Sequence, residues 1–518
     1  MFRFIFLFLI GFSFVLRSLY SLHMLQLEEY SGKKFIKWAI ANVNRYLSNV
    51  FLVIGMILFF FDSLIFIAIS AVIIAIYIDF RKFFFRKQKK PLVYTKRLKR
   101  LLVVSYVLFG VLFSRVVVLN SLLLELPFLG VVIFNSFYFW IINALMLPLE
   151  TAINNYYLKD GMRKFKSLRP VTVAVTGSYG KTSTKYFINH LLGEHYSTLM
   201  TPESYNTSMG ITRTIREKLD KNHEIFVVEF AENEKGGYKR LLKLVKPDIS
   251  VITSIGIQHF EEFGSMENIL KNFAEYAQLK DSGKVLIVNA DDENIMKVVK
   301  DMKSKKVISV GIENVEAQYR AENIDIYKNG SKFTLKTTTG LSMEVETPVY
   351  GLENIRNILL AIATAFELKV PVDEVLERLK TLTLPDHRLQ IIRDDTVTVI
   401  DDTFNSNPKG SRMALDYLKL YNDRRKIIVT PGYVELGEKE DEEHVKLGKE
   451  IAKVADYVFL VGEGRTKKIY EGLILEGFSR DKIKVVRNLE EVSNILKTFV
   501  KPGDVILFEN DLPDTYES

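Results

Sequence analysis

The stretch Thr176-Gly-Ser-Tyr-Gly-Lys-Thr-Ser-Thr184 decides the fold of the second part of this 518-residue chain. An apolar, β-branched run, residues 171–175, precedes it, and residues 185–192 follow with the pattern of a helix. Strand, glycine loop and helix in this order form a cradle for a polyphosphate, because glycines let backbone N–H groups approach the phosphates. Lys181 adds positive charge, and the hydroxyl of Thr182 suits a phosphate-bound Mg²⁺. The stretch therefore predicts a nucleoside triphosphate site.

The loop is a shortened form of the usual phosphate-binding motif. Val175 stands where G-x-x-x-x-G-K-[ST] has its first glycine, so the pattern here is G-x-x-G-K-T. Such a match is weak when it stands alone in a loop. The strand before it and the helix after it therefore carry the interpretation.

Composition divides the chain into two unlike parts. Hydrophobic residues make up 48% of the chain and the mean hydropathy is +0.09, although 25% of the residues are charged. Residues 1–150 contain long apolar runs, whereas residues 151–518 have the composition of an ordinary α/β protein. The length suggests three or four domains. The absence of cysteine excludes disulfides, thiolate metal sites and cysteine nucleophiles, and fits a cytosolic catalytic part.

The net charge of +8 has a local origin. Residues 81–100 hold ten Lys and Arg residues and no acidic residue, and the rest of the chain is close to neutral. Between apolar segments, such a run indicates the cytoplasmic flank of membrane helices rather than a nucleic-acid site. The partner expected from this run is the lipid bilayer, and no nucleic acid is expected.

Four apolar segments have the length of membrane spans, which need about 20 residues; they cover residues 4–22, 51–78, 101–119 and 122–147. The first has no small-residue cleavage site, so we expect an uncleaved helix rather than a signal peptide. The second is either one tilted helix or a hairpin broken near Asp62-Ser63. One helix gives four spans with both termini cytoplasmic, and a hairpin gives five spans with the N-terminus outside.

Residues 81–100 are cytoplasmic under both arrangements, while the side of the moderately basic residues 22–51 stays open. Buried helices of a soluble protein are the alternative for all four segments, and their length and low charge argue against it. We therefore expect residues 1–150 to be a transmembrane helical region with about four spans. The protein is then expected in the inner cell membrane, as a multi-pass protein with cytoplasmic catalytic domains.

In residues 151–518 strand-like runs alternate with helical patterns, which is typical of mostly parallel sheets covered by helices in an α/β fold. A first domain, residues 151–384, is expected to have strands at 171–175, 225–229, 249–254, 285–289 and 307–310, then antiparallel hairpins within 317–349 that turn at 328–331. Residues 385–393 mark a boundary. A Rossmann-like second domain, residues 385–518, is expected to have strands at 396–400, 426–430, 457–461, 483–486 and 504–508.

Polar motifs follow several of these strands, at the carboxyl ends where ligands bind in open α/β sheets. They are Glu229, His259, Asn289-Ala-Asp-Asp292 and the run Asp401-Asp-Thr-Phe-Asn-Ser-Asn-Pro408. Taken alone, Glu229 would be read as an ion-paired residue and His259 as a structural one. Their shared position after strands is what makes them candidates for a site.

These motifs, in this order, resemble those of the Mur ligases, which are ATP-dependent enzymes that build the peptide of peptidoglycan. The ordered pieces are TGSYGKTST (176–184), TPESYNTSMG (201–210), VVEFAENEKGG (227–237), KPDISVITSIGIQHFEEFGSMENI (246–269), VNADDE (288–293), GLENIRN (351–357), DHRLQ (386–390), VIDDTFNSNP (399–408) and KPGDVILFEN (501–510). They are most similar to the branch that adds D-alanyl-D-alanine to a UDP-linked muramyl tripeptide. The resemblance implies that ATP phosphorylates a carboxylate and that an amine attacks the acyl-phosphate.

The resemblance also implies a role for each site residue. The phosphate cradle would be Gly177, Ser178, Tyr179, Gly180, Lys181, Thr182 and Ser183. The ligands of Mg²⁺ would be Thr182, Glu229 and His259, and the catalytic residues Lys181, Glu229 and His259. The nucleotide would further meet Asn289, Asn354, Asn357, Arg388 and Asp402, with capping as the alternative for the pair Asn354 and Asn357. The carboxylate substrate would face Asn206 and Thr207.

The sequence departs from the family in three places. The usual N-terminal domain, which holds the UDP group, is replaced by the apolar region, which suggests a lipid-linked carboxylate substrate. Many members carry a carbamylated lysine about nine residues after a Gly-Ser pair; here that position is Phe273, and Lys271 lies nearby. The late basic KGSR-like segment is acidic here, with Glu509 and Asp511, which suggests an amine substrate with extra positive charge or a plain surface loop.

Several functions remain open from the sequence. The leading hypothesis is a membrane-anchored, ATP- and Mg²⁺-dependent ligase of a carboxylate and an amino acid or peptide amine in cell-envelope synthesis. Alternatives are a standard D-alanyl-D-alanine-adding ligase on UDP-MurNAc-tripeptide with an added anchor, a polyglutamate-type ligase, and an ATP-binding scaffold without catalysis. The phosphate loop, Glu229, His259 and Asp402 favour an enzyme, and the missing lysine favours the scaffold.

Overall fold

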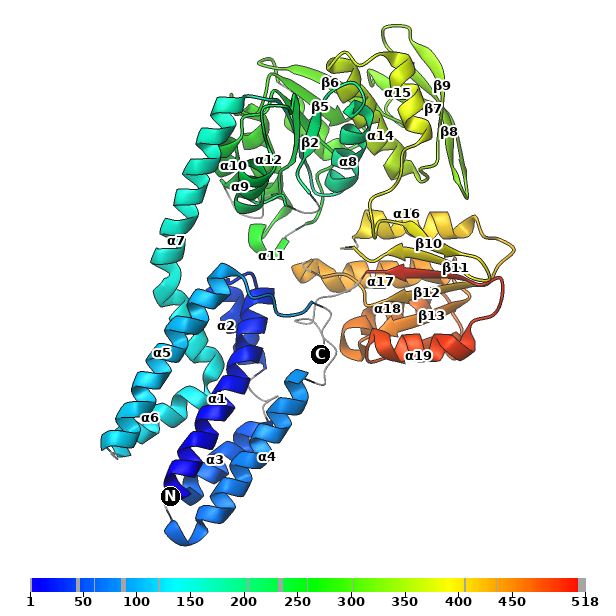
Figure 1. Cartoon of the computed structure of the whole chain (residues 1–518). Coiled ribbons are helices and arrows are strands. Elements are labelled where there is room, and N and C mark those ends of the chain that lie inside the picture. The colour runs from blue at the N-terminus through cyan, green and yellow to red at the C-terminus, as the bar shows by residue number, and fades with distance from the viewer. Residues whose placement is uncertain are drawn as a thin grey trace. The chain divides into compact units, whose positions relative to one another are not determined.

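The computed structural model describes residues 2–42, 47–59, 61–84, 90–119, 122–202, 205–231, 236–258, 260–300, 302–404, 407–434 and 436–510. These residues form two compact units that divide after Asn154 (Figure 1). The expected division at residue 150 lies close to this point.

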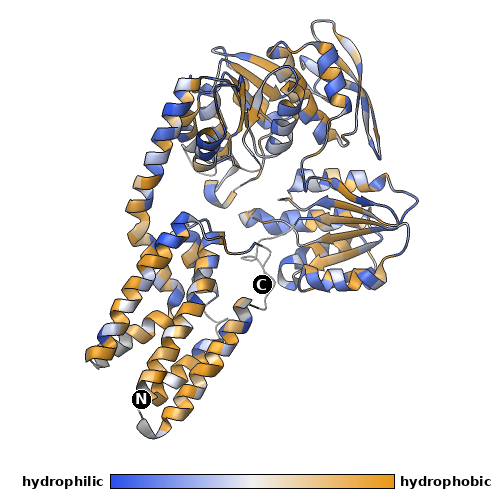
Figure 2. Cartoon of the chain, in the orientation of Figure 1, coloured by the Kyte–Doolittle hydropathy of each residue, from blue (hydrophilic) through white to orange (hydrophobic). Residues whose placement is uncertain are grey.

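Unit 1 is helical, and its helices carry mostly hydrophobic residues (Figure 2). Its elements are α1 Phe2–Leu27, α2 Gly32–Ala41, α3 Leu47–Phe59, the 3₁₀ turn η2 Asp62–Leu64, α4 Ile65–Phe84, α5 Lys96–Leu119, α6 Leu122–Ile133 and α7 Asn135–Leu168, which continues into unit 2. Three helices of the described part are long and apolar enough to cross a membrane: Phe4–Leu27, Lys96–Val118 and Asn135–Leu168.

Two of the four apolar segments are not continuous helices, and for residues 51–78 this agrees with the hairpin alternative. In the described part of residues 51–78, α3 and α4 pack against each other as a hairpin with η2 between them, where Asp and Ser favour a turn over a helix. Residues 122–147 divide at Phe134 into α6 and α7. Asn135 and Ser136 stand directly after that break, and both residue types are favoured at a helix start.

A buried ion pair connects three helices of unit 1. Arg17 of α1 contacts Asp79 of α4 at 2.7 Å between Nε and Oδ2, and it also donates to the hydroxyl of Ser48 on α3 at 2.7 Å. That hydroxyl donates in turn to Asp79 at 2.6 Å. Charges among apolar helices are costly unless they are paired, and here each charge meets its opposite.

The first domain of unit 2 is built on a nine-stranded sheet with the strand order β2-β3-β1-β4-β5-β6-β7-β8-β9. The strands are β1 Val171–Thr176, β2 Thr198–Met200, β3 Ile225–Glu229, β4 Ile249–Ile252, β5 Val285–Asn289, β6 Lys306–Gly311, β7 Tyr319–Tyr327, β8 Gly330–Thr337 and β9 Ser342–Thr347. The pairs from β2 to β7 are parallel, and β7, β8 and β9 are antiparallel. The five expected parallel strands and the hairpins are confirmed, while the three-residue β2 was not predicted.

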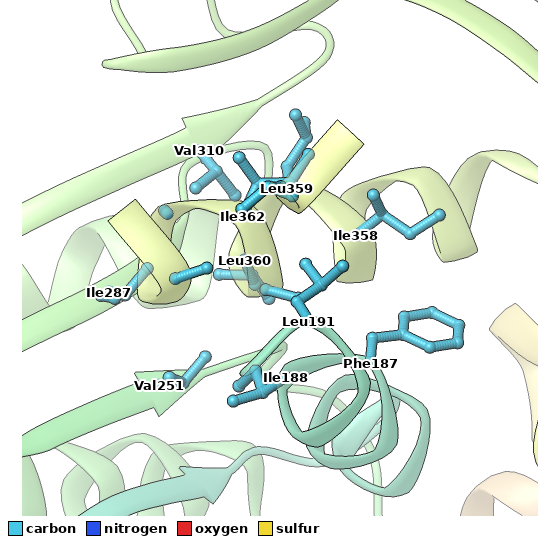
Figure 3. Close-up of a cluster of buried hydrophobic side chains, with 14 of the residues drawn as sticks. Phe187, Ile188, Leu191, Val251, Ile287, Val310, Ile358, Leu359, Leu360 and Ile362 are labelled. Carbon is cyan, nitrogen blue, oxygen red and sulfur yellow. The ribbon is translucent and has the colours of Figure 1, made fainter. Parts of the chain in front are cut away.

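The helices of this domain are α8 Lys181–Leu192, α9 Ser208–Glu217, α10 Gly237–Leu244, α11 Phe260–Phe263, α12 Met266–Gln278, α13 Glu293–Val299, α14 Leu352–Glu367 and α15 Val372–Lys380. Helices α8 and α14 pack together on one face of the sheet (Figure 3). Phe187, Ile188 and Leu191 of α8 and Ile358 and Leu359 of α14 are fully or almost fully buried there. This core fixes the start of α8, and with it the glycine loop, against the sheet.

The second domain of unit 2 has a six-stranded sheet with the order β10-β11-β15-β12-β13-β14. Its strands are β10 Gln390–Asp394, β11 Thr398–Asp402, β12 Lys426–Thr430, β13 Tyr457–Val461, β14 Ile483–Val486 and β15 Val505–Glu509, and its longer helices are α16 Pro408–Lys419, α17 Glu440–Ala452, α18 Glu463–Leu475 and α19 Leu489–Phe499. Only β10 is antiparallel to its neighbour within this sheet of described residues. The five expected strands are confirmed, and β10 occupies the segment that was read as a boundary.

Candidate active site

The glycine loop connects β1 to α8 at the centre of the larger sheet. Strand β1 lies between β3 and β4, so the connections that follow β1 and β3 lead to opposite sides of β1. Such a switch point leaves a crevice at the carboxyl ends of the strands. Gly177 has φ +141° and Gly180 has φ +80°, values that side chains disfavour. A Cβ on Gly180 would lie 2.7 Å from Oδ1 of Asn357, so this glycine also permits close contact with α14.

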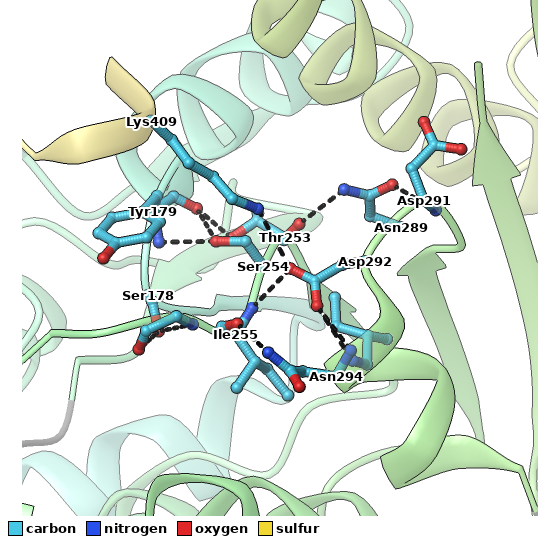
Figure 4. A network of polar contacts seen from close by, with 12 residues as sticks. Ser178, Tyr179, Thr253, Ser254, Ile255, Asn289, Asp291, Asp292, Asn294 and Lys409 are labelled. Atoms are coloured by element: carbon cyan, nitrogen blue, oxygen red, sulfur yellow. Dashed lines mark hydrogen bonds and ion pairs between the residues drawn. The ribbon is translucent and has the colours of Figure 1, made fainter. Parts of the chain in front are cut away.

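The loop that follows β4 holds the glycine loop in place through a dense set of hydrogen bonds (Figure 4). The backbone N–H of Ser178 donates to the carbonyl of Ser254 at 2.7 Å, and that of Tyr179 donates to the Ser254 hydroxyl at 2.8 Å. The hydroxyl of Thr253 donates to the Tyr179 carbonyl at 2.5 Å. The phosphate loop is therefore fixed by residues about 75 positions away in sequence.

Lys181 is buried at the first position of α8. Its Nζ donates to the carbonyls of Gly177 at 2.6 Å and Ser178 at 2.9 Å, and to Oε1 of Gln258 at 3.2 Å. Burial lowers the pKa of Lys181 to about 8, and the carboxylate of Glu229 opposes this shift. An ammonium with few charged partners in a dry site suits an incoming phosphate.

Arg388 reaches the phosphate loop from the segment between the two domains. Its Nη2 donates to the hydroxyl of Thr182 at 3.3 Å, and its guanidinium lies 4.5 Å from the ring centre of Phe404. Its two neighbours, His387 with φ +59° and Leu389 with φ +53°, adopt left-handed backbone conformations. Such conformations are uncommon for bulky residues and persist where the surroundings impose them. The turn thereby aims Arg388 at the start of α8.

A pocket with an empty volume of about 710 Å³ brings most of the expected nucleotide residues together. Its lining includes the expected residues Tyr179, Gly180, Ser183, Asn289, Asn354, Asn357, Arg388 and Asp402. The side chains that sequence reasoning missed are Thr253, Ser254, Glu353, Arg356, Phe404, Asn407, Lys409 and Met413. Six of these residues had a signal, since they lie inside the quoted motifs 246–269, 351–357 and 399–408, whereas Lys409 and Met413 lie in none of them.

Asn354 and Asn357 both line the pocket and both already have partners. The amide of Asn354 donates to the Tyr350 carbonyl at 2.9 Å, and Oδ1 of Asn357 accepts from the Thr184 hydroxyl at 3.1 Å. These bonds give both residues a structural task beside any contact with a nucleotide.

Asp402 ends β11 and accepts a hydrogen bond from the backbone N–H of Leu389 at 2.9 Å. Burial in the pocket raises the pKa of Asp402 to about 7, the charge of Glu509 adds to this rise, and Arg388 opposes it. Asp402 thus changes charge near neutral pH, in contact with the segment that carries Arg388.

Replacing Asp402 by asparagine is expected to remove a pH dependence of stability. Because the pKa of Asp402 is higher in the folded protein than in the unfolded chain, its stabilising contribution is complete below about pH 4 and is lost as the pH rises through about 7. The Tm of Asp402→Asn should therefore rise relative to wild type, by a few degrees, between about pH 5 and about pH 8. Differential scanning fluorimetry of both proteins measures this, and a Tm difference that stays constant with pH would contradict the expectation.

Glu229 lies at the end of β3 with both carboxylate oxygens in contact with neighbours. Oε1 accepts from the amide of Asn206 at 3.0 Å, and Oε2 lies 3.1 Å from Nζ of Lys185. Burial alone would raise the pKa of Glu229, but the charges of Lys185 and Lys181 lower it below its usual value. Lys185 was not predicted from the sequence, although it stands one helical turn after Lys181.

The residues near the loop suit a magnesium ion that is held mainly by phosphates. Thr182 offers a hydroxyl at the start of α8 and Glu229 an ionised carboxylate on the neighbouring strand, and hard Mg²⁺ prefers such oxygen ligands. Among the described residues, no group of three or more His, Asp or Glu side chains forms a site of its own. His259, the third expected ligand, lies outside the described residues.

Several other residues that the sequence singles out are not part of this lining where the structure describes them. Phe273 is buried against Tyr238 in the core, whereas Lys271 is exposed on α12 and has no place in a buried metal site. The hydroxyl of Thr207 caps α9 by accepting from the N–H of Gly210 at 3.3 Å. Glu509 is buried and accepts a hydrogen bond from Ser411, so it is no exposed loop residue. Asp511 lies outside the described residues.

Two family models match this chain. The Mur ligase middle domain matches residues 175–365, and the Mur ligase glutamate ligase domain matches residues 387–509. The curated UDP-N-acetylmuramoyl-tripeptide–D-alanyl-D-alanine ligase of Bacillus subtilis (strain 168) is 28% identical over 341 residues, covering 65% of this chain and 72% of the relative. The enzyme of the same name from Escherichia coli (strain K12) is 30% identical over 295 residues, covering 56% of this chain and 64% of the relative.

Solved structures of MurF proteins are also similar to this chain. The crystal structure of MurF from Acinetobacter baumannii has a TM-score of 0.60 and 27% identity, covering 69% of this chain and 77% of the other. The MurF ligase from Thermotoga maritima, solved in complex with ADP, has a TM-score of 0.61 and 26% identity, covering 69% of this chain and 80% of the other. The two matched family models together span more than half of the chain, which therefore belongs to the Mur ligase family.

Proposed function

We propose that this protein is a membrane-anchored ligase that joins the carboxylate of a cell-wall precursor to an amine at the cytoplasmic face of the membrane. As a member of the Mur ligase family, it is an ATP-dependent, ADP-forming ligase that uses Mg²⁺. The proposal adds the membrane anchor and a lipid-linked carboxylate substrate. The observation that carries it is the presence, in one chain, of a pocket beside the glycine loop and of a helical unit in whose described part three helices have membrane-spanning length.

The proposed reaction has two steps that balance. A carboxylate oxygen of the precursor attacks the γ-phosphorus of ATP, the bond between the γ-phosphorus and the bridging oxygen breaks, and ADP leaves. A neutral amine then attacks the acyl carbon, the bond from that carbon to the phosphate oxygen breaks, and inorganic phosphate leaves while the nitrogen loses a proton. The products are an amide, ADP and phosphate.

The residues of the pocket would supply the charge that this chemistry needs. Lys181 and Arg388 meet at the start of α8 and would bind the phosphate oxygens, on which negative charge accumulates during transfer. Thr182 and Glu229 would hold Mg²⁺, which when bound neutralises phosphate charge and orients the transferred group. The neighbouring Asn206 contacts Glu229 and would orient the carboxylate substrate beside it.

One end of unit 1 collects basic residues from two separate parts of the chain. Gln26, near the end of α1, exchanges two hydrogen bonds with the backbone of Val93, at 2.8 and 2.9 Å. The ring of Tyr30 lies 4.1 Å from the guanidinium of Arg97. These contacts join the lysine-bearing start of α2 to the basic segment before α5. By the positive-inside rule, this end would face the cytoplasm.

The same contacts indicate where the soluble part begins. Arg100 of α5 forms an ion pair with Glu150 of α7 at 2.5 Å, so α7 leaves unit 1 at the basic end. The chain that follows residue 150 would therefore start on the cytoplasmic side, where ATP is available. The hairpin of α3 and α4 supports the arrangement of five crossings, with the N-terminus outside.

Cysteine labelling tests this orientation, because the natural chain has no cysteine and a single introduced thiol reports alone. Lys33→Cys, at the basic end, is expected to react with a membrane-impermeant maleimide only in inside-out vesicles. Ser63→Cys, in the turn between α3 and α4, is expected to react only in intact cells, and the cysteine-free wild type serves as the blank. Labelling of both variants from the same side would contradict the proposed crossings.

The similarity to D-alanyl-D-alanine-adding ligases favours one alternative, a standard ligase of this kind that also has an anchor. Turnover by the full chain in detergent separates the two functions, with ADP release measured for a soluble UDP-muramyl tripeptide and for a lipid extract of the producing cell. D-alanyl-D-alanine and single amino acids serve as amines. Turnover that requires the lipid extract supports the proposal, whereas full turnover with the soluble tripeptide supports the standard ligase. A protein that binds ATP and releases no ADP with either would be a scaffold.

A further inference from the structure

Lys185, on the helix that begins at the glycine loop, forms a buried ion pair with Glu229. It lies on α8 one turn after Lys181, and Nζ is 3.1 Å from Oε2 of Glu229. The two side chains are only 2% and 1% exposed, respectively. The other oxygen of the carboxylate accepts from Asn206 at 3.0 Å, so the orientation of Glu229 is set from two sides. Burying an ammonium group costs free energy. We therefore expect Lys185 to have a role that an apolar side chain could not perform.

The surroundings of the pair contain a second cation and apolar side chains. Lys181 lies close enough for its charge to act on Glu229. The position expected to carry a carbamylated lysine is Phe273, which packs in the core at 5.7 Å between its ring centre and that of Tyr238. Lys271 is exposed. Among the described residues, Lys185 is therefore the cation in direct contact with Glu229.

We propose that Lys185 is a positioning residue that neutralises and orients Glu229, so that the site attracts polyphosphate before a divalent cation is bound. The inference rests on the proposed function, because it assigns Glu229 to the magnesium and phosphate site. A bare carboxylate near the phosphate loop would repel an incoming nucleotide. The positive charge of the Lys185 ammonium cancels this repulsion.

A purely structural ion pair would behave differently from a positioning pair. A structural pair contributes to folding, and its loss lowers the Tm while the effect of Mg²⁺ on nucleotide binding stays as it was. A positioning pair changes how strongly nucleotide binding depends on Mg²⁺. The ratio of ADP affinity with Mg²⁺ to ADP affinity in EDTA therefore distinguishes the two roles without any measurement of turnover.

The experiment uses the full chain in detergent and fluorescent mant-ADP, titrated in Mg²⁺ and in EDTA. Lys185→Met is expected to weaken mant-ADP binding in EDTA by at least about tenfold. The loss in Mg²⁺ should be smaller, because Lys181 keeps Glu229 ionised and bound Mg²⁺ can screen the negative charge of Glu229. Glu229→Gln is expected to have the opposite effect on the ratio, because it should reduce the increase in mant-ADP affinity that Mg²⁺ produces. Lys185→Arg keeps the charge and should retain most of the binding in EDTA.

Two further variants keep the result interpretable. The double variant Lys185→Met/Glu229→Gln leaves no unpaired buried charge, so it should fold and bind mant-ADP in EDTA about as well as wild type. Lys305→Met removes a partly buried lysine elsewhere in the same domain, where Nζ donates to the Leu279 carbonyl at 2.7 Å, and should leave the ratio unchanged.

An unchanged ratio in Lys185→Met, with only a lower Tm, would overturn the inference and leave a structural ion pair. A wild-type protein that binds no mant-ADP in Mg²⁺ would instead overturn the proposed function itself. The two failures are therefore distinguishable in the same titration.

Discussion

Lys181→Met is expected to lower ADP-forming turnover by about 10³-fold, the scale of losing one charged group that stabilises a transition state. The reason lies in the position of Nζ, which donates to the Gly177 and Ser178 carbonyls of the loop that would surround the phosphates. A methionine fills the same buried space without the charge, so folding should be kept. Turnover is measured as ADP release, and the Tm is measured alongside it.

Lys181→Arg tests whether the charge alone suffices. The lysine is enclosed by three acceptors, and a planar guanidinium does not fit that arrangement, so most of the loss should remain. Lys305→Met is the matched control, because it removes a partly buried lysine whose Nζ donates to the Leu279 carbonyl and the Ser282 hydroxyl rather than to the glycine loop. Turnover of Lys181→Met close to that of the control would contradict the assignment of the phosphate site.

The parts of the fold that sequence predicted correctly are those set by local pattern. The run at residues 171–175 is β-branched and apolar, the glycine loop follows, and the helix is continuous, so β1 and α8 formed where expected. The same holds for the parallel strands, each of which is a short apolar run before a polar motif. Asn289 and Asp402 each end a parallel strand, where ligands bind in such sheets, but they belong to different sheets, and the pocket that they line with Arg388 could be seen only in the fold.

Features that depend on contacts between distant parts of the chain could not be predicted from the sequence. The edge strand β2 has three residues and no pattern of its own, and it exists because β3 offers a free edge. A lysine on a helix is usually read as solvent-exposed, and only the fold shows that Lys185 faces Glu229. The contact between Gly180 and Asn357 likewise joins residues that are far apart in the chain.

The acidic end of β15 shows how burial escapes a reading of charge pattern alone. Glu509 was singled out because an acidic segment replaces an expected basic one, and the structure places it inside the second domain, bonded to Ser411 and acting on the charge of Asp402. Asn510 follows with φ +66° and donates to the Gly432 carbonyl at 2.7 Å. The buried position of Glu509 could be seen only in the folded domain.

Gly177→Ala is expected to abolish nucleotide binding, with a loss of at least about 100-fold in mant-ADP affinity, which corresponds to about 2.7 kcal/mol. A Cβ at this position would lie 2.2 Å from Oγ1 of Thr253 and 2.9 Å from the backbone N of Ser254, so either the glycine loop or the loop after β4 must move. That movement would break the bond from the Ser178 N–H to the Ser254 carbonyl, which holds the loop in its shape.

The control for Gly177→Ala is Gly503→Ala, which separates steric contact from backbone strain. Gly503 also has a positive φ, +90°, but an added Cβ would meet nothing within 4 Å, so only a conformational cost of about 1 kcal/mol is expected there, with no effect on mant-ADP affinity. Thr253→Ala combined with Gly177→Ala removes the closest contact and leaves the backbone contact, so it should restore binding only in part. Full binding by Gly177→Ala alone would show that the glycine loop does not hold the phosphates, because the clash leaves no way to keep its present shape.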